Sequence, residues 1–139
     1  REPLADTVEL RAVVCDPVPI KHLDLMTVTK ADLSFASDFQ MKVTRNDYVH
    51  AFLGWFDIGF EACHKPVRFS TGPHSRYTHW KQTVFYTPNT LTVSQGDTIE
   101  GRLTCTPNVR NPRDLDISIR YNVVGPNPVS GELAYKMYV

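Results

Sequence analysis

The 139-residue sequence has no excess of charge of either sign, since 15 Lys and Arg residues balance 15 Asp and Glu residues. Proteins that bind nucleic acid usually carry a strong basic excess, so the composition gives no support to a direct nucleic-acid partner. No stretch approaches the ~18 apolar residues of a membrane span, and the first residues do not form a signal-peptide pattern. We therefore expect no membrane partner and no direct contact with nucleic acid.

Cysteine is scarce, and the three residues Cys15, Cys63 and Cys105 are an odd number at wide spacings. This pattern does not describe a disulfide framework. Because disulfides form in oxidising compartments, reduced thiols predict a cytoplasmic or nuclear protein. The sequence also opens on Arg1 without an initiator Met, so we expect a processed or excised piece.

Recognisable cofactor and metal motifs are missing. The seven glycines are scattered and form neither a G-x-G-x-x-G pattern nor a phosphate-binding loop. The histidines lack the H-x-H and H-E-x-x-H spacings of metal ligands; they are His22, His50, His64, His74 and His79. Cys63 has no local motif of a catalytic nucleophile, and a small apolar residue at a strand end is the simpler interpretation. The residues themselves predict no metal site and no cofactor site.

The pattern of apolar residues predicts an all-β fold. Residues 3–14 favour one short helix, because Pro3 suits a first turn and Asp6 and Glu9 favour its N-terminal half; Pro17 then ends it. Beyond it, apolar and polar residues alternate as they do in strands with one buried face. The predicted strands are residues 20–25, 39–44, 48–60, 82–86, 98–106, 115–123 and 133–138.

Turn-forming residues separate these strands at 87–89, 94–97, 107–108 and 125–128. Short strands at such intervals are typical of an antiparallel barrel or sandwich. No linker divides the chain, so we predict one domain over residues 1–139. Residues 48–60 are expected to form one long central strand, with a bulge at Gly54 or Gly59.

Two features are candidates for a site. Asp114 and Asp116 are two residues apart and would share one strand face, either as an acidic binding strip or as an ordinary solvated surface. The segment 69–82 begins with turn residues and places His79 beside Trp80. Loops held by a rigid sheet often carry binding groups, although Trp80 could also fill the core.

The same segment resembles the loop named after its Thr-His-Trp sequence in protein arginine N-methyltransferases. The similarity covers essentially the whole chain, is closest to the type I (asymmetric-dimethylating) branch, and is weakest over residues 125–139. It is carried by YTHWKQTVFY at 77–86, RNDYVHA at 45–51, NPRDLD at 111–116 and EPL at 2–4.

This resemblance implies a role for each member of the trio. His79 matches a catalytic-site histidine that pairs with an acidic side chain of the neighbouring domain. Trp80 matches a tryptophan that walls the pocket for the substrate arginine, and Thr78 matches a residue that positions the loop. A histidine can donate to a carboxylate and an aromatic face can meet a guanidinium, so the chemistry suits these roles.

The resemblance further implies a parent enzyme that uses S-adenosylmethionine and dimethylates arginines in Arg/Gly-rich proteins such as histones and RNA-binding proteins. The donor-binding domain, the dimerisation arm and the first barrel strand would then precede Arg1. We expect no cofactor in this region alone, no activity of the isolated chain, and a homodimeric parent. Two alternatives remain: a free-standing β-sandwich that binds peptide or carbohydrate, and a barrel-only relative kept for scaffold contacts.

Overall fold

The computed structural model describes residues 2–60, 64–65, 67–75 and 81–138, in which nine β-strands and two short 3-10 helices are present. The chain divides into two compact units. The first comprises Arg1–Glu2, Val14–His50 and Pro88–Val139, and the second comprises Pro3–Val13 and Ala51–Thr87. Strands β3 (Asp47–Gly54) and β6 (Gln82–Val93) each run from one unit into the other.

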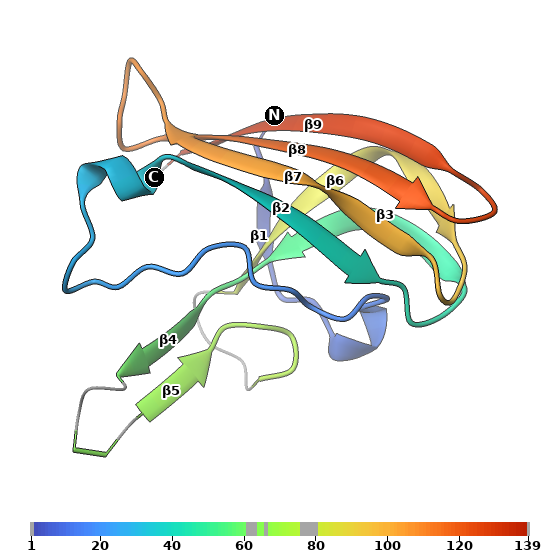
Figure 1. The fold of residues 1–139 in the computed structure, drawn as a ribbon, viewed down its shortest axis with the longest axis horizontal. Helices are drawn as coiled ribbons and strands as arrows, with labels where there is room; N and C mark the ends of the chain where they lie inside the picture. The colour runs from blue at the N-terminus through green and yellow to red at the C-terminus, as the bar shows by residue number, and fades with distance from the viewer. Residues whose placement is uncertain (1, 61–63, 66, 76–80, 139) are drawn as a thin grey trace. The chain divides into compact units, whose positions relative to one another are not determined.

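The first unit is built on a four-stranded antiparallel sheet (Figure 1). Its order is β2 (Phe35–Lys42), β7 (Thr98–Pro107), β8 (Leu115–Val124) and β9 (Val129–Met137). Strict alternation along β8 buries one set of side chains, which are Ile117, Ile119, Tyr121 and Val123. The residues between them face the other way, so the sheet has one apolar and one polar face.

On the apolar face, large and glycine residues alternate across the sheet. The register sets Phe39 opposite Gly101, Gly101 opposite Tyr121, and Tyr121 opposite Gly131. A Cβ atom at Gly131 would lie 2.3 Å from the Tyr121 hydroxyl oxygen, and one at Gly101 would lie 2.9 Å from the Phe39 ring. The two rings therefore occupy the space that the glycines leave.

The second unit holds β1 (Leu4–Asp6), which pairs with the first residues of β6, and the hairpin of β4 (Asp57–Phe60) and β5 (Val67–Ser70). Strand β6 lies between β1 and β3 in a three-stranded sheet. Val84 and Phe85 are its buried apolar residues within this unit. They are adjacent, so the strict alternation is lost there.

The predicted all-β fold is confirmed, with corrections to its elements. Within residues 3–14, the short N-terminal helix is the 3-10 turn η1 (Leu10–Ala12), and the predicted helical extent is wrong because β1 forms backbone pairs with β6. Residues 20–25 do not form the predicted strand; they are irregular and turn structure. The second 3-10 helix is η2 (Lys30–Leu33), and no helix in the described part of the chain is long and apolar enough to span a membrane.

Two further corrections concern strand boundaries. Residues 48–60 form two strands and not one, because the chain leaves β3 at Gly54 and Thr71 hydrogen-bonds to both backbone groups of Phe56 before β4 begins. The predicted turn at 87–89 lies inside β6, where Pro88 is exposed. A proline in a strand is tolerated where its missing N–H is not needed for pairing. The predicted turns at 94–97 and 125–128 are confirmed.

Candidate functional site

The predicted site residues Thr78, His79 and Trp80 lie outside the described residues. The structure does describe the chain on both sides of them, up to Ser75 and again from Lys81. The residues on both sides of the trio belong to the second unit. What the structure describes is therefore the two ends of the segment that carries the trio.

Thr71 fixes the upstream end. Its side chain is 1% exposed, and its hydroxyl donates to the Phe56 carbonyl at 2.9 Å and accepts from the Phe56 N–H at 3.1 Å. The Thr71 N–H also donates to the Phe56 carbonyl at 3.0 Å. Beyond it, the Ser75 N–H donates to the Gly72 carbonyl at 3.2 Å, which closes a turn. Thr71 thus attaches this end to the stretch between β3 and β4.

Gln82 fixes the downstream end. It is 7% exposed, and its Nε2 donates to the Thr71 carbonyl at 2.6 Å. Its Oε1 accepts from the Val8 N–H at 2.7 Å. Lys81, directly before it, has a φ of 56°, a left-handed conformation that residues with a side chain adopt only where the surrounding structure holds it. The first residue of β6 is therefore joined both to Thr71 and to the N-terminal stretch.

Trp55 and His74 pack beside the upstream turn. Their ring centroids are 6.0 Å apart with an interplanar angle of 64°, an edge-to-face contact. A Cβ atom at Gly72 would lie 2.6 Å from the Trp55 Nε1 and 2.7 Å from the His74 Cε1. Because these distances are too short for non-bonded atoms, only a glycine fits between the two rings without rearrangement.

Sequence reasoning missed the contacts that Thr71, Gln82 and Trp55 make at the two ends of this segment. For Gln82 a signal was present: it is two residues from Val84, so both side chains point to the same face of the strand. A polar residue on a buried face needs a hydrogen-bond partner, and Thr71 provides it. Thr71 and Trp55 carry no comparable signal, because their roles depend on a fold in which chain segments 15 or more residues apart meet.

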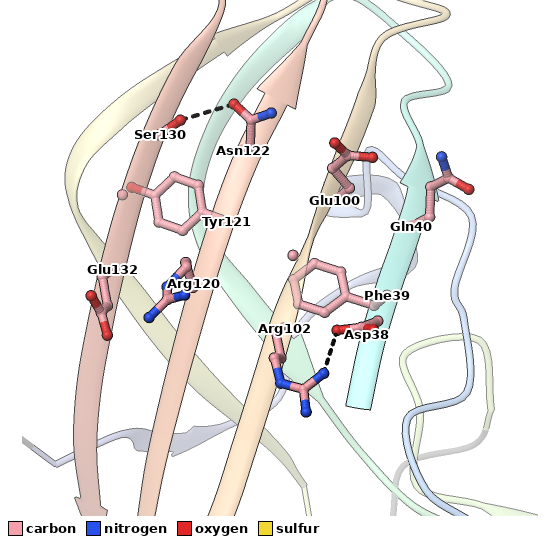
Figure 2. A pocket seen from close by; sticks show the side chains of 12 residues that line it. Asp38, Phe39, Gln40, Glu100, Arg102, Arg120, Tyr121, Asn122, Ser130 and Glu132 are labelled. Carbon is pink, nitrogen blue, oxygen red and sulfur yellow. Dashed lines mark hydrogen bonds and ion pairs between the residues drawn. The ribbon is translucent and has the colours of Figure 1, made fainter. Parts of the chain in front are cut away.

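A separate hollow of about 850 Å³ lies on the four-stranded sheet of the first unit, open to solvent (Figure 2). Arg102 and Asp38 form an ion pair at 2.8 Å, and Ser130 donates to Asn122 at 2.9 Å. Arg120 lies opposite both Arg102 and Glu132 in the register, yet no ion pair within the described part of the chain includes it. The lining mixes both signs of charge, which does not define one class of ligand.

The remaining candidates do not assemble into a site. Within the described ranges, no group of three or more His, Cys, Asp and Glu side chains could hold a metal ion. His22, His50, His64 and His74 are exposed, and Cys63 lies outside those ranges. Asp114 is buried before β8 begins, whereas Asp116 accepts from the Asn108 Nδ2 at 3.1 Å, so the two do not form an exposed acidic strip.

Two solved structures show the class to which this fold belongs. The chain superimposes with a TM-score of 0.93 and 39% identity on the Trypanosoma brucei PRMT1 enzyme–prozyme heterotetrameric complex with AdoHcy, covering 99% of this chain and 44% of that one. It also superimposes on Arabidopsis thaliana protein arginine methyltransferase 10, with a TM-score of 0.90 and 20% identity over 97% of this chain and 42% of that one. The second likeness shows the fold alone. The architecture is that of the β-rich region of protein arginine methyltransferases.

The sequence comparison gives the family. Residues 1–126 match the model of the arginine methyltransferase oligomerization subdomain, and the chain belongs to this family. It is 58% identical over 99% of its length to protein arginine N-methyltransferase 1 of Schizosaccharomyces pombe, and 44% identical over 98% to protein arginine N-methyltransferase 1.1 of Arabidopsis thaliana. The chain covers 42% and 35% of these two relatives. The resemblance predicted from the loop sequence is confirmed.

Proposed function

We propose that this chain is the substrate-side β region of a longer, S-adenosylmethionine-dependent protein arginine methyltransferase of type I. The observation that carries the proposal is the 58% identity to the fission yeast enzyme over 99% of this chain, with the Thr-His-Trp sequence intact. The substrates would be arginines in Arg/Gly-rich proteins, such as histones and RNA-binding proteins, in the cytoplasm or nucleus. The chain covers less than half of that relative, and we assign the activity to the longer protein.

The described residues do not fit the methyl donor. S-adenosylmethionine presents a carboxylate, a ribose and a sulfonium, and its site must enclose it and supply groups for each. The hollow on the four-stranded sheet is open and is lined by side chains of both charge signs. We therefore assign donor binding to the part of the longer protein outside this chain. The isolated chain should neither bind the donor nor transfer methyl groups.

The trio would supply one wall of the arginine site. Trp80 presents an aromatic face to the guanidinium, His79 donates a hydrogen bond to an acidic side chain of the donor-binding domain, and Thr78 positions the loop. Direct methyl transfer depends on alignment of nucleophile and donor, and misplacement by about 1 Å can lower the rate on the order of 100-fold. These residues therefore act by fixing the arginine.

Assembly is the remaining part of the proposal. The matched family model is described as an oligomerization subdomain, and the Trypanosoma brucei neighbour is a heterotetrameric complex. These descriptions support an oligomeric parent protein. We propose a homodimer formed through an arm that precedes this chain.

The test compares the longer protein with the 139-residue chain. Methyl transfer to an Arg/Gly-rich peptide is measured for both, and donor binding is measured by calorimetry. We expect transfer and donor binding from the longer protein and neither from the chain. Donor binding to the chain at micromolar concentration would contradict the assignment of the donor site. An upstream coding sequence without a donor-binding domain would instead favour the free-standing binding module.

Two substitutions test the site itself. In the longer protein, His79→Ala and Trp80→Ala should lower kcat/KM per folded molecule by on the order of 100-fold without unfolding. His22→Ala, which removes an exposed histidine of the first unit, is the control. If the two residues only pack in the core, activity would fall in proportion to the loss of folded protein.

A further inference from the structure

The hairpin of β4 and β5 in the second unit has one apolar and one polar side. Residues directly opposite each other in an antiparallel pair point to the same side, and successive residues point to opposite sides. The register sets Ile58 opposite Phe69 and Phe60 opposite Val67. The large apolar residues therefore share one side, called the ribbon face here; they are Ile58, Phe60, Val67 and Phe69. The other side carries Asp57, Gly59, Arg68 and Ser70.

The ribbon face is open to solvent at the end nearest the hairpin loop. Phe60 is 52% exposed and Val67 is 54% exposed, whereas Ile58 and Phe69 are half-buried. By contrast Ile119, on the apolar face of the four-stranded sheet, is 2% exposed. Phe60 and Val67 therefore lack the cover that the apolar residues of the first unit have.

A two-stranded ribbon needs such cover to be stable. In the described part of the chain β4 and β5 pair only with each other (Figure 1). An isolated pair of strands is marginally stable in water, and a third strand or packing against another element is required for independent stability. The ribbon face therefore has the properties of a docking surface.

The size of the ribbon face decides between two kinds of occupant. Four residues along two strands span about 13 Å by about 10 Å, so each copy would contribute on the order of 100 Å² to a contact between two identical chains. A stable interface between separate proteins buries about 800 Å² on each partner. A domain of the same polypeptide is not held to this minimum, because covalent linkage raises its effective concentration to about the millimolar range.

The relatives are long enough to supply such a domain. The chain covers 42% of the fission yeast relative and 44% of the Trypanosoma brucei chain, so more than half of each lies outside the matched region. The polar side of the hairpin is not suited to an apolar contact, because it presents the exposed charged residues Asp57 and Arg68, and burying a charge is costly. Only the ribbon face can pack against an apolar surface of this additional domain.

We propose that the ribbon face docks against an apolar patch on the donor-binding domain of the same polypeptide, which covers Phe60 and Val67. The proposal rests on the proposed function in naming that domain, whereas the open apolar face rests on the register and the exposure of the described residues. The hairpin then joins this chain to the domain that holds the methyl donor.

Photo-cross-linking from Phe60 tests the occupant directly. In the longer protein, Phe60→p-benzoylphenylalanine keeps a large aromatic side chain on the ribbon face, and on irradiation it bonds covalently to the group that it contacts. Unlabelled and ¹⁵N-labelled copies are assembled together, so peptide mass spectrometry separates cross-links within one copy from cross-links between copies. We expect a cross-link to the donor-binding domain of the same copy. A cross-link to a second copy, or none to any other domain, would overturn the proposal.

Arg68→p-benzoylphenylalanine is the matched control, since Arg68 is next to Val67 and lies on the polar side of the same ribbon. It should give no cross-link to the donor-binding domain. Equal cross-linking from Phe60 and Arg68 would show that the ribbon face is not the docking surface.

A second measurement needs no substitution, and it decides the question if the Phe60 variant does not fold. Hydroxyl-radical oxidation of side chains is measured in the unaltered longer protein and normalised to the rates in urea. Phe60 should be oxidised severalfold more slowly than Tyr48 and Tyr138, which are 61% and 59% exposed in this chain. Equal normalised rates would overturn the proposal. A longer protein that transfers no methyl group would contradict the proposed function alone, because the cross-link identifies the cover of the ribbon face whether or not the enzyme turns over.

Discussion

Gly72 is fully enclosed by its neighbours, although its backbone does not require a glycine. A Cβ atom would lie within 2.8 Å of two Trp55 atoms and of one His74 atom. Overpacking of this kind typically costs about 1–3 kcal/mol. Gly72→Ala should therefore lower the free energy of unfolding by about this amount, measured by urea denaturation.

Gly54→Ala provides the comparison within the same unit. Its Cβ atom would lie 3.5 Å from the nearest atom, on Phe85, which is an ordinary van der Waals distance. We expect its unfolding free energy to stay within about 1 kcal/mol of wild type. Equal stability of the Gly72 and Gly54 variants would show that the Trp55 and His74 rings yield without cost.

The Cys15 thiol gives a pH-dependent prediction. Burial, and secondarily the nearby Asp16 carboxylate, raise the pKa of Cys15 from 9.0 to about 11. The folded state therefore favours the neutral thiol; this contribution to stability is complete below pH 9.0 and is lost as the pH rises through about 11. Since the thiolate is the reactive form, alkylation of Cys15 at pH 8 should be roughly 100-fold slower in the native protein than in urea.

The measurement follows iodoacetamide labelling of Cys15 by peptide mass spectrometry. The native rate should keep rising about tenfold per pH unit between pH 8 and pH 10, as expected for a group still below its pKa. Cys105 is a buried thiol whose pKa is also raised by burial, and it should be slow for the same reason. A native Cys15 rate that levels off by pH 9 would contradict the raised pKa.

At the scale of single residues, the sequence predicts the trio but does not show the contact between Thr71 and Gln82. Thr78, His79 and Trp80 are adjacent in the sequence, so a local motif is enough to predict a site there. Thr71 and Gln82 become partners only because the chain returns to the same place, and this information is not local. A polar residue on the buried face of a strand, as Gln82 is, was the one available indication.

At the scale of strands, alternation predicted well where one face is buried and the other solvated. Residues 115–123 were predicted from strict alternation, and β8 spans Leu115–Val124. Prediction was poor where both faces are partly covered or where a hydrogen bond decides the boundary. The run 48–60 is mostly apolar, so its sequence does not show that Thr71 will hydrogen-bond to Phe56. Residues 20–25 alternate but have no neighbouring strand to pair with in the described structure.

In the four-stranded sheet, Tyr121 of β8 lies between Gly101 of β7 and Gly131 of β9. This arrangement gives a prediction for the stability of the sheet. Gly131→Ala should lower the free energy of unfolding by about 1–3 kcal/mol, because its Cβ would meet the Tyr121 ring. Tyr121→Leu removes the end of that ring. In a double-mutant cycle, the two changes together should destabilise the sheet less than the sum of the two. Ser130→Ala, on the exposed face of the same strand, is the control and should change stability little.

If the changes in unfolding free energy were additive, Gly131 and Tyr121 would contribute to stability independently of each other. The register sets them opposite each other on β8 and β9, so independence would contradict the packing described here. Measurement by urea denaturation of all four proteins gives the coupling energy directly.

At the scale of the whole molecule, the edges of the four-stranded sheet bear on solution behaviour. β2 and β9 are the outer strands in the sheet order of the described residues. Exposed strand edges can pair with another chain. The isolated chain should therefore self-associate with increasing concentration, as measured by sedimentation velocity.

Lysine substitutions on the edge strand β9 test whether this edge makes the contact between chains. Ser130→Lys and Ala134→Lys on β9 should weaken self-association, because lysines on an edge strand oppose edge-to-edge pairing. If the association is unchanged in this double variant, β9 is not the contact. A strict monomer at high concentration would argue against an open edge in any strand.

The connectivity of the same sheet also governs the order in which it can form. β7, β8 and β9 follow one another along the chain through short connections. β2 also pairs with β7, but residues 43–97 separate the two strands in the sequence. Closing a long loop carries more entropy loss than forming a hairpin, and contacts between distant residues slow folding. We expect the three-stranded meander to form early and β2 to join late. Substitutions in β2 should therefore mainly accelerate unfolding, whereas substitutions in the β7–β8 pair should slow refolding.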